Sequence, residues 1–485
     1  MKTGWQREPR GARDAERPKQ CVPTPERGNE KKRTHPKRYN RRQILRRAAA
    51  AGGLLAAPCF IPSTVLGQDG AVAPSNRITL GSIGVGMMGQ GHLRCCLGYP
   101  EAQVLAVCEV DQWRREHAKA AVEQGYAAGQ AGGTYRGCDT YRDLRELLAR
   151  DDVDAVVIAT GDNWHGLATV LAAKAGKDFY CEKPISKTIR EARAMAETAR
   201  RYGRVGQIGL QQRSTPEFIK ACRLVQEGRI GKVKMVYVIF AGTSSEVNLP
   251  VEPVPEGLDW DQWLGPAPWR PFNGRFHHYG RPPHVVPWHF CRDFGGGNLT
   301  SNTVHAFDTV QWGLGMDESG PVEVIPPETG QVPSLTYKYA NGILLQVVNG
   351  KLDPQRHFIP EGWDPNARIQ NFGAVFVGEE GWIHVGRQGY LASFPKEIVD
   401  EPGGAADPLH PVNNHHQNWF ECIKTRKQPA CDVSVGCRST IVSHLGCIAH
   451  WTGRALRWDP VKEEFPGDDE ANRLRFRSMR EPWRL

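Results

Sequence analysis

The sequence lacks the features that mark a disulfide scaffold, a membrane protein or a nucleic-acid-binding protein. Its 13 cysteines never form a Cys-x-x-Cys spacing, which favours buried thiols over paired or metal-binding cysteines. No apolar run approaches the roughly 20 residues needed to cross a bilayer. The formal charge of +9 arises in residues 1–47, which hold 16 Lys and Arg against 5 Asp and Glu. The rest of the chain is close to neutral, which argues against a nucleic-acid partner.

The N-terminal segment is typical of an export signal. Residues 40–46, NRRQILR, are close to the twin-arginine pattern, and residues 48–60 form a short, weakly apolar stretch. Val65-Leu66-Gly67 offers small residues where a signal peptidase cuts. Residues 1–67 are therefore predicted to be a signal peptide that directs the folded protein through the Tat export machinery to the periplasm. The apolar stretch is too short for a membrane anchor.

A glycine fingerprint follows the first strand pattern of the chain. Residues 77–83 are predicted to form a buried strand, which runs directly into GVGMMG at residues 84–89, a G-x-G-x-x-G motif. The first glycine permits a tight turn, the second lets the backbone approach a pyrophosphate, and the third lets the next helix pack closely on the strand. The helix N-terminus adds free N–H groups for the phosphates. The predicted cofactor contacts in this loop are Gly84, Gly86, Met88 and Gly89.

An acidic residue stands at the position expected for a ribose contact. Residues 104–108 are predicted to be a second strand, and Glu109 follows it about twenty residues after the glycine loop. A carboxylate there accepts hydrogen bonds from both ribose hydroxyls and repels a 2′-phosphate, which favours NAD over NADP. Asp111 is an alternative for the same role.

Strand and helix patterns then alternate along the chain. Residues 153–159 and 179–181 are predicted strands, while residues 165–175 and 189–202 are predicted helices. Repeated β–α units predict a doubly wound parallel sheet with its ligand at the carboxyl ends of the strands. Residues just past these strands are predicted to contact the cofactor: Thr160, Asn163, His165, Glu182 and Lys183.

A Glu-Lys-Pro motif at residues 182–184 joins the glycine fingerprint and the stretch Asp162-Asn163-Trp164-His165 in a specific combination. This combination resembles the Gfo/Idh/MocA family of oxidoreductases, and the resemblance extends over residues 76–485. It includes residues 211–213, QQR, and 258–266, LDWDQWLGP. The later pieces are similar to the Tat-exported branch of the family in particular.

The resemblance implies an α/β protein of two domains. It places a Rossmann domain with a doubly wound parallel sheet over residues 76–205 and an α/β substrate domain with an open, mostly antiparallel sheet over residues 206–485. In the family that sheet often forms an oligomer surface, so a homo-oligomer is expected. The resemblance also implies NAD as the cofactor, with Gln212 among its contacts, and a carbohydrate or polyol as the substrate.

A lysine suits the chemistry of alcohol oxidation. It can take up a hydroxyl proton where burial or nearby positive charge lowers its pKa. The resemblance gives Lys183 the role of binding and polarising the substrate hydroxyl, with Glu182 as the neighbour that orients it. It assigns the second half of the site to His305, preceded by an aspartate four residues earlier on the same helix face. In this chain Ser301 occupies that place, while Asp308 matches the family pattern.

Ser301 leaves three interpretations open. Serine can hydrogen-bond a sugar hydroxyl but cannot hold a charge beside His305. His305 could act as acid and base with Asp308 or another carboxylate compensating, the substrate could differ, or the site could have kept binding and lost redox turnover. A second departure is Cys437, where the related branch usually has histidine.

The connection over residues 241–297 is long and rich in proline, tryptophan and phenylalanine. Its aromatic faces suit either a carbohydrate pocket or packing of the loop onto its own domain. Its histidines follow no known metal-ligand spacing, so no metal site is predicted.

The sequence therefore predicts an exported oxidoreductase that transfers hydride between NAD and a secondary hydroxyl of a sugar, glycoside or cyclitol. Two alternatives remain: an NAD-dependent lyase or glycosidase working by elimination, and a catalytically silent sugar-binding protein. Because free NAD is scarce outside the cytoplasm, an exported enzyme is expected to hold its nucleotide tightly and to regenerate it in place with a second substrate.

Overall fold

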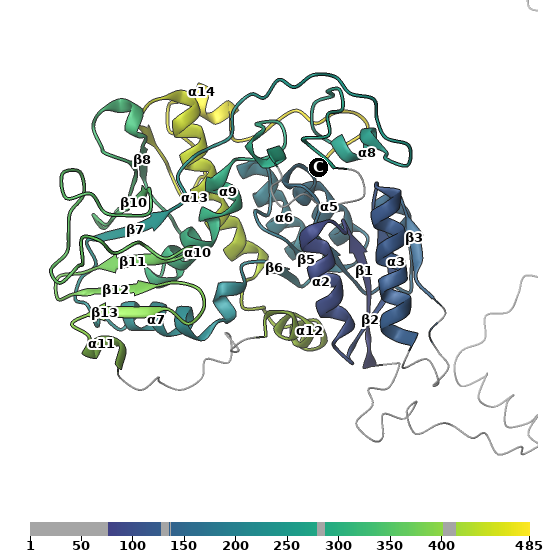
Figure 1. Cartoon of the computed structure of the whole chain (residues 1–485), viewed down its shortest axis with the longest axis horizontal. Helices are drawn as coiled ribbons and strands as arrows, with labels where there is room; N and C mark the ends of the chain where they lie inside the picture. Colours follow the sequence, from purple (N-terminus) through teal and green to yellow (C-terminus); the bar gives the residue numbers. More distant parts are fainter. Residues whose placement is uncertain (1–75, 128–134, 136, 279–286, 401–413) are drawn as a thin grey trace, which may run out of the picture. The chain divides into compact units, whose positions relative to one another are not determined.

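Two β-sheets organise the described part of the chain (Figure 1). The computed structural model describes residues 76–127, 135, 137–278, 287–400 and 414–485. The predicted signal peptide and the predicted cleavage site lie outside these ranges. Both sheets belong to one compact unit of the chain.

The first sheet has six parallel strands in the order β3-β2-β1-β4-β5-β6. This is the strand order of a dinucleotide-binding fold, and the order reverses between β1 and β4, where such folds bind their ligand. The strand bounds are β1 Ile78–Ile83, β2 Ala102–Cys108, β3 Asp139–Tyr141, β4 Ala155–Ile158, β5 Asp178–Cys181 and β6 Gly206–Ile208.

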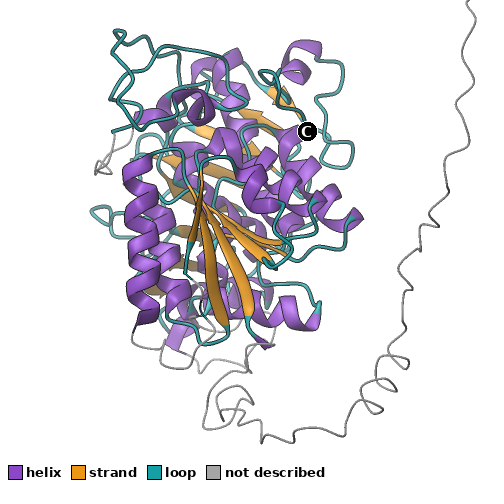
Figure 2. Ribbon diagram, turned by 90° about the vertical axis from the view of Figure 1, so that its right-hand side faces the viewer, coloured by secondary structure: helices purple, strands orange, loops and turns teal. Residues whose placement is uncertain are grey.

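Helices lie on both sides of this twisted sheet (Figure 2). Every residue of β4 and β5 is buried, which explains why these strands are almost entirely apolar in sequence. The helix bounds are α2 Met87–Leu97, α3 Gln112–Ala127, α4 Leu144–Leu148, α5 Asp162–Lys174 and α6 Ile189–Arg201.

One helix begins at a different residue from that expected, and the start of another is fixed by a cap. The helix α5 begins at Asp162, shortly after β4 and three residues before the predicted start. Asp162 and Asn163 therefore lie in its first turn and not in a loop. The helix α4 begins after Asp143, whose side chain accepts a hydrogen bond from the N–H of Arg145 and caps the N-terminus.

The second sheet has eight strands in the order β13-β12-β11-β7-β10-β9-β8-β14. Only the β7–β10 pair is parallel, and every other neighbouring pair is antiparallel. The expected open and mostly antiparallel sheet is therefore confirmed. The strand bounds are β7 Met235–Ile239, β8 Glu323–Ile325, β9 Leu335–Lys338, β10 Leu344–Val348, β11 Ala374–Val377, β12 Trp382–Val385, β13 Leu391–Phe394 and β14 Leu456–Arg457.

Helices cover one face of the second sheet, and the chain between β10 and β11 contributes apolar side chains to the other. The buried residues Leu352, Trp363 and Ile369 of that connection pack against Tyr237 and Trp382 of the sheet. The remaining helix bounds are α7 Pro216–Gln226, α8 Trp260–Leu264, α9 Asn298–Ser301, α10 Thr303–Gly313, α11 Glu397–Asp400, α12 His415–Thr425, α13 Val433–Thr452 and α14 Asp469–Arg473.

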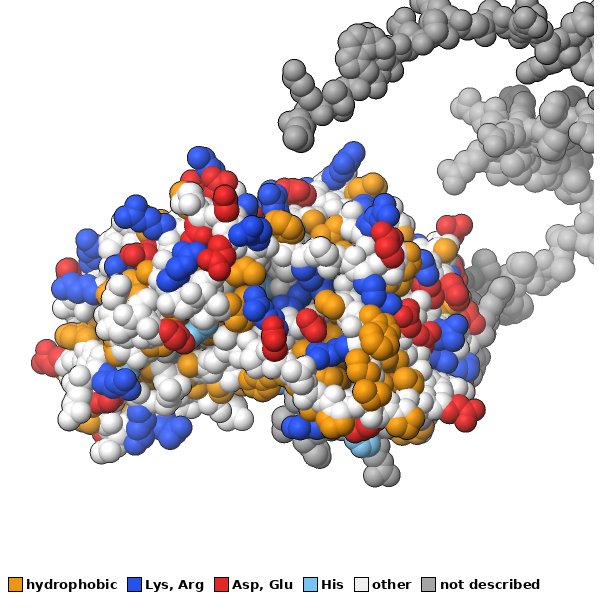
Figure 3. All heavy atoms as spheres, turned by 90° about the horizontal axis from the view of Figure 1, so that it is seen from above, with side chains coloured by type: hydrophobic (Ala, Val, Ile, Leu, Met, Phe, Trp, Pro, Cys, Tyr) orange, Lys and Arg blue, Asp and Glu red, His pale blue; other side chains and the backbone are white. Residues whose placement is uncertain are grey.

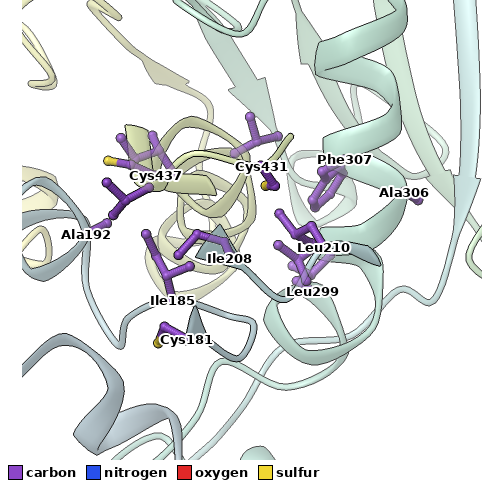
Figure 4. Packing of buried hydrophobic residues seen from close by; sticks show 14 of the residues in the cluster. Cys181, Ile185, Ala192, Ile208, Leu210, Leu299, Ala306, Phe307, Cys431 and Cys437 are labelled. Atoms are coloured by element: carbon purple, nitrogen blue, oxygen red, sulfur yellow. The ribbon is translucent and has the colours of Figure 1, made fainter. Parts of the chain in front are cut away.

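One hydrophobic core continues from the first sheet into the second. Ile185 follows the Glu-Lys-Pro motif, Ile208 ends β6, and Leu299 and Phe307 come from α9 and α10 (Figure 4). Cys437 of α13 is fully buried in the same core, so this second departure from the family pattern is a packing position. Each fully buried side chain of this kind stabilises the fold by about 1.5–3 kcal/mol. The segments from both sheets that flank the candidate site therefore pack in the same core.

The helix α12 belongs to the second half of the chain but packs on the first sheet. Its residues Trp419 and Phe420 are buried in one cluster with Leu80, Val104 and Val157 of that sheet. The sequence pattern gave no sign of this return, because it depends on contacts between segments more than 200 residues apart.

Acidic and basic side chains are interspersed on the face that carries α8, α14 and the C-terminal residues (Figure 3). None of the described helices is long and apolar enough to cross a membrane. All eleven described cysteines are free thiols, as their spacing suggested.

Candidate active site

The glycine loop between β1 and α2 has the shape its motif predicts. Gly84 adopts a φ of 80°, which favours glycine, and a Cβ at Gly89 would lie 2.0 Å from the carbonyl oxygen of Gly84. At Gly86 the nearest obstacle to a Cβ is a side-chain nitrogen of Arg114 at 3.5 Å. The first and third glycines are required by the fold, and the second leaves open space for a ligand.

Glu109 is the acidic residue that faces this space. It follows β2, and its carboxylate accepts a hydrogen bond of 2.9 Å from the N–H of Val85 in the glycine loop. Asp111 does not line the pocket: it is fully buried, accepts from the N–H of Arg114 at 3.1 Å and pairs with His277 at 3.0 Å. The alternative that gave Asp111 the ribose contact therefore does not fit, because its carboxylate starts α3 and binds the long connection.

Two pockets meet beside the glycine loop. The first, of about 210 Å³, contains the loop and Glu109. The second, of about 820 Å³, contains Lys183 and His305. Both are lined by Met87, Met88, Ala159, Thr160 and Trp288. The open cradle at Gly86, the carboxylate of Glu109 and this continuity fit a dinucleotide whose reactive end enters the second pocket.

Lys183 brings its amine from the end of β5 to α9. The Nζ atom donates a hydrogen bond of 2.7 Å to the backbone carbonyl of Ser301. Lys183 is half-buried and lines the second pocket. The two halves of the site predicted from the sequence are therefore in direct contact.

Glu182, next to Lys183, is held by hydrogen bonds at the end of β5. Its carboxylate is buried and accepts hydrogen bonds from Gln211 at 2.9 Å and from the N–H of Lys183 at 3.1 Å, and it bonds the ring of His92 at 2.8 Å. Burial alone would raise the pKa of Glu182, but the bond and charge of His92, with the charge of Lys183, hold it below its usual value. Glu182 is thus a charged group that positions Lys183 through its backbone.

His305 is almost completely buried in α10. Burial first, and then the charges of Lys183 and Arg387, hold the pKa of His305 well below its usual value, so the ring is neutral. Its Nδ1 atom and the Oγ atom of Ser301 both lack a hydrogen-bond partner among the described residues. The helix breaks at Asn302 between α9 and α10, so Ser301 and His305 do not share one continuous helical face.

Asp308 points away from the pocket. Its carboxylate binds Arg213 at 2.9 Å and accepts a hydrogen bond of 2.7 Å from the hydroxyl of Ser439. Arg213 also binds Asp317 at 2.7 Å. The structure therefore does not bring Asp308 to His305, because a buried ion-pair network behind α10 uses its carboxylate.

Asp162 is a pocket carboxylate that the predicted site residues did not include. It lies in the first turn of α5, lines the second pocket, and has an Oδ2 atom that is buried without a partner among the described residues. Burial raises the pKa of Asp162 to about 7, against the opposing charges of Lys183 and Lys187. Its place directly after a parallel strand was the signal that could have revealed it.

Three further predicted residues frame the junction of the pockets. Thr160 lines both, and Asn163 lines the first while donating a hydrogen bond of 2.9 Å to the carbonyl of Leu264. The ring of His165 lies between the carbonyls of Pro184 at 2.7 Å and Thr160 at 3.1 Å. His165 thus braces the ends of β4 and β5, and burial lowers its pKa.

The mouth of the second pocket is built by loops of the second sheet. Gln212 donates a hydrogen bond of 2.7 Å to the carbonyl of Phe372. The ring of Phe372 meets the ring of His305 edge-on at 5.6 Å between centroids. The guanidinium carbon of Arg387 lies 3.7 Å from the centroid of Phe372. No sequence pattern singled out Phe372 or Arg387. Within the described ranges, no group of three His, Cys, Asp or Glu residues is placed to hold a metal ion.

Comparison with known proteins agrees with this arrangement. The family model for the NAD-binding Rossmann fold of an oxidoreductase family matches residues 78–210. The model for the C-terminal alpha/beta domain of the same family matches residues 237–485, which is half of the chain. The chain belongs to the Gfo/Idh/MocA oxidoreductase family. The pocket with the glycine loop and Glu109 is accordingly the NAD-binding site of this Gfo/Idh/MocA member.

Curated relatives of this Gfo/Idh/MocA protein match it in part. Inositol 2-dehydrogenase 2 of Saccharopolyspora erythraea is 29% identical over 194 residues, which are 39% of this chain and 53% of that protein. Rhizopine catabolism protein MocA of Rhizobium meliloti is 27% identical over 241 residues, or 50% of this chain and 58% of that protein. The chain spans about half the length of the curated relatives it matches.

Solved structures share the fold of this Gfo/Idh/MocA protein. Aldose-aldose oxidoreductase from Caulobacter crescentus, complexed with glycerol, has a TM-score of 0.51 at 17% identity and covers 79% of this chain and 99% of its own. Levoglucosan dehydrogenase, in complex with NADH and levoglucosan, has a TM-score of 0.51 at 18% identity with the same coverage. At these identities the likeness is one of fold.

Proposed function

We propose that this Gfo/Idh/MocA protein is an NAD-dependent oxidoreductase acting on a secondary hydroxyl of a sugar, glycoside or cyclitol. The observation that carries the proposal is the opening of the nucleotide pocket into the pocket that holds Lys183 and His305. The relatives named as inositol 2-dehydrogenases support it, as does the neighbour described with NADH and levoglucosan.

The two residues divide the work of binding and proton transfer. The Lys183 amine, held by the carbonyl of Ser301, donates to the substrate oxygen and polarises its O–H bond. The neutral ring of His305 has a free Nδ1 atom that accepts the hydroxyl proton during oxidation. In the reverse direction the protonated ring returns that proton to the alkoxide. NAD, when bound, supplies the hydride acceptor.

The surroundings of the pocket favour this chemistry. Glu182 fixes the strand end that carries Lys183, and its negative charge favours the protonated form of His305 that arises in the reaction. Asp162 adds a second acid on the pocket wall with a free oxygen for a substrate hydroxyl.

The proposal is tested by following NADH absorbance while hexoses, glycosides and inositols are added to protein loaded with NAD. We expect a rise with one sugar class that is lost in Lys183→Ala and kept in Lys396→Ala, an exposed lysine on the second sheet's edge. Loaded protein that binds a sugar but forms no NADH would support the catalytically silent alternative. Release of an unsaturated sugar without net NADH would instead indicate elimination.

We also propose, from the pattern in residues 40–46 alone, export by the twin-arginine route to the periplasm. Replacing Arg41 and Arg42 by lysine is expected to keep the protein in the cytoplasm in a fractionation experiment. Secretion that is unchanged by the double substitution would overturn this proposal. A homo-oligomer is likewise proposed from the family resemblance, and light scattering of the purified protein tests it.

A further inference from the structure

We propose that the substrate is a sugar acid and that Arg387 binds its carboxylate. This inference rests on the proposed function and deepens it by naming the substrate class.

Arg387 belongs to the wall of the second pocket. It follows β12, its side chain is exposed at the pocket mouth, and it is a lining residue together with Lys183 and His305. Its guanidinium stacks on the ring of Phe372 at 3.7 Å, and that ring in turn contacts His305 at 5.6 Å. The three side chains form a continuous row that leads from the mouth to the proposed proton acceptor.

The backbone that presents this row is unusual. Phe372 has a φ of 59° and Gln388, next to Arg387, has a φ of 64°. Side chains with a Cβ pay roughly 1–2 kcal/mol for this left-handed conformation. Backbone strain of this kind persists where the surrounding structure holds it and is frequent at ligand sites.

The N–H groups of the Arg387 guanidinium have no hydrogen-bond acceptor among the described residues. Among the described residues no hydrogen bond or ion pair involves it, whereas Arg213 behind α10 binds two carboxylates. Stacking on an aromatic ring fixes the plane of the guanidinium and leaves its in-plane N–H groups free. A fork of parallel donors is the geometry that a carboxylate accepts in a bidentate manner.

Two of the three described acidic side chains that line the second pocket are engaged elsewhere. Glu182 is bound by His92 and Gln211, and Glu217 accepts a hydrogen bond from the N–H of Gly389 at 3.2 Å. Asp162 lies deep in the first turn of α5 and is opposed by the charges of Lys183 and Lys187.

Ser301 fits the same ligand. A carboxylate at this position would stand beside Lys183 and repel an anionic substrate, and serine removes that charge. Lys183 and Arg387 then act on the same ligand from two sides, one on the reacting hydroxyl and one on the carboxylate.

One guanidinium favours a carboxylate over a phosphate. A phosphate ester carries close to two negative charges at neutral pH and would require further cations. Lys183 is the other cationic side chain among the described lining residues, and in this proposal it faces the reacting hydroxyl and not the acid group. Arg387 and His305 both contact the ring of Phe372, so one ligand in the pocket can reach both side chains.

The test compares sugar acids with their neutral counterparts. NAD-loaded protein is assayed for NADH formation with glucuronate and galacturonate against glucose and galactose, and binding of the same four compounds is measured by calorimetry. For the wild type we expect kcat/KM to be about 100-fold higher for an acid than for its neutral counterpart, the size of one strong charge-assisted pair.

The variants assign that preference to Arg387. In Arg387→Met the ratio of kcat/KM for the acid to kcat/KM for its neutral counterpart is expected to fall to about one, through KM. The effect of the lost charge on His305 is shared by both substrates and does not change this ratio. Arg387→Lys retains part of the ratio. Arg387→Glu is expected to favour glucosamine over glucuronate. Arg356→Met, on an exposed turn away from the pocket, is the matched control and keeps the wild-type preference. Ser301→Asp is expected to weaken glucuronate binding at least tenfold more than glucose binding.

The outcomes separate this inference from the proposed function. Equal kcat/KM for acids and neutral sugars, or a loss in Arg387→Met that is the same for both, overturns the role of Arg387 while leaving the oxidoreductase intact. Binding of glucuronate that depends on Arg387 but produces no NADH would support the ligand class and contradict the proposed redox function. Tighter binding of glucose 6-phosphate than of glucuronate would replace the carboxylate by a phosphate and overturn the inference.

Discussion

The amine of Lys183 is held by the backbone carbonyl of Ser301, at 2.7 Å, and not by its side chain. The position of Lys183 is therefore independent of which side chain residue 301 carries. The replacement of the family's aspartate by Ser301 therefore affects His305 without displacing Lys183. The lysine keeps its place, and only the partner of His305 is missing.

Restoring a carboxylate in Ser301→Asp should change the pH dependence of the reaction through His305. A negative charge near the unpartnered Nδ1 atom stabilises the imidazolium, so the pKa of His305 rises from its depressed value. We expect the acidic limb of the pH–rate profile on a neutral sugar to shift to higher pH. Ser301→Asn, which carries no charge, should leave the limb in place. An identical profile for both variants would contradict the assigned role of His305.

Asp162 should make the protein less stable as the pH rises. Its folded-state pKa of about 7 exceeds the unfolded value of 3.8, so between about pH 4 and pH 7 the folded state keeps a proton that the unfolded state has lost. The free energy of unfolding therefore falls through this window, by up to about 4 kcal/mol. Asp162→Asn should remove this part of the slope and be the more stable protein above about pH 7. Chemical denaturation at several pH values checks it, and parallel curves for both proteins would contradict it.

Glu109 should decide between the two nicotinamide cofactors. Glu109→Ala removes the acceptor for the ribose hydroxyls and the repulsion of a 2′-phosphate. We expect NAD affinity to fall about tenfold, which is about 1.4 kcal/mol, and NADP affinity to increase, as measured by calorimetry. Asp111→Asn is the contrast, because its buried carboxylate binds α3 and His277. That variant should lower the melting temperature and keep the ratio of the two affinities.

His92 should support the active site through Glu182. In His92→Phe the buried Glu182 carboxylate loses its closest partner, which should lower the free energy of unfolding by about 2–3 kcal/mol. The pKa of Glu182 should rise as well, since His92 supplies the main opposing influence to burial. As the pH is lowered, activity should then be lost at a higher pH than in the wild type. A purely structural role would change stability without moving the pH profile.

The parts of the site that could be predicted lie in local motifs. The glycine loop, Glu109 and Lys183 each directly follow a buried strand, so the sheet places them at one edge without any further information. Glu109 and Asp111 both follow β2, and the sequence alone could not decide which of them contacts the ribose. The choice falls on Glu109 because Asp111 caps α3 and pairs with His277, a residue of a distant loop.

The parts that could not be predicted depend on distant segments. Asp308 matched the family pattern by position, yet Arg213 and Ser439 draw its carboxylate to the far side of α10. Phe372 and Arg387 meet because the loops before β11 and after β12 lie side by side in an antiparallel pair. No periodicity in the sequence predicts the contact between these two side chains.

The packing of α12 on the first sheet has a consequence for the order of synthesis. Trp419 and Phe420 cover part of one face of the nucleotide-binding sheet, and they are made more than 200 residues after its last strand, β6. Until then the strands that carry the glycine loop have an uncovered apolar face, and a fragment ending at residue 205 would expose it permanently. The nucleotide-binding sheet therefore completes its core only after α12 has been made and has folded back onto it.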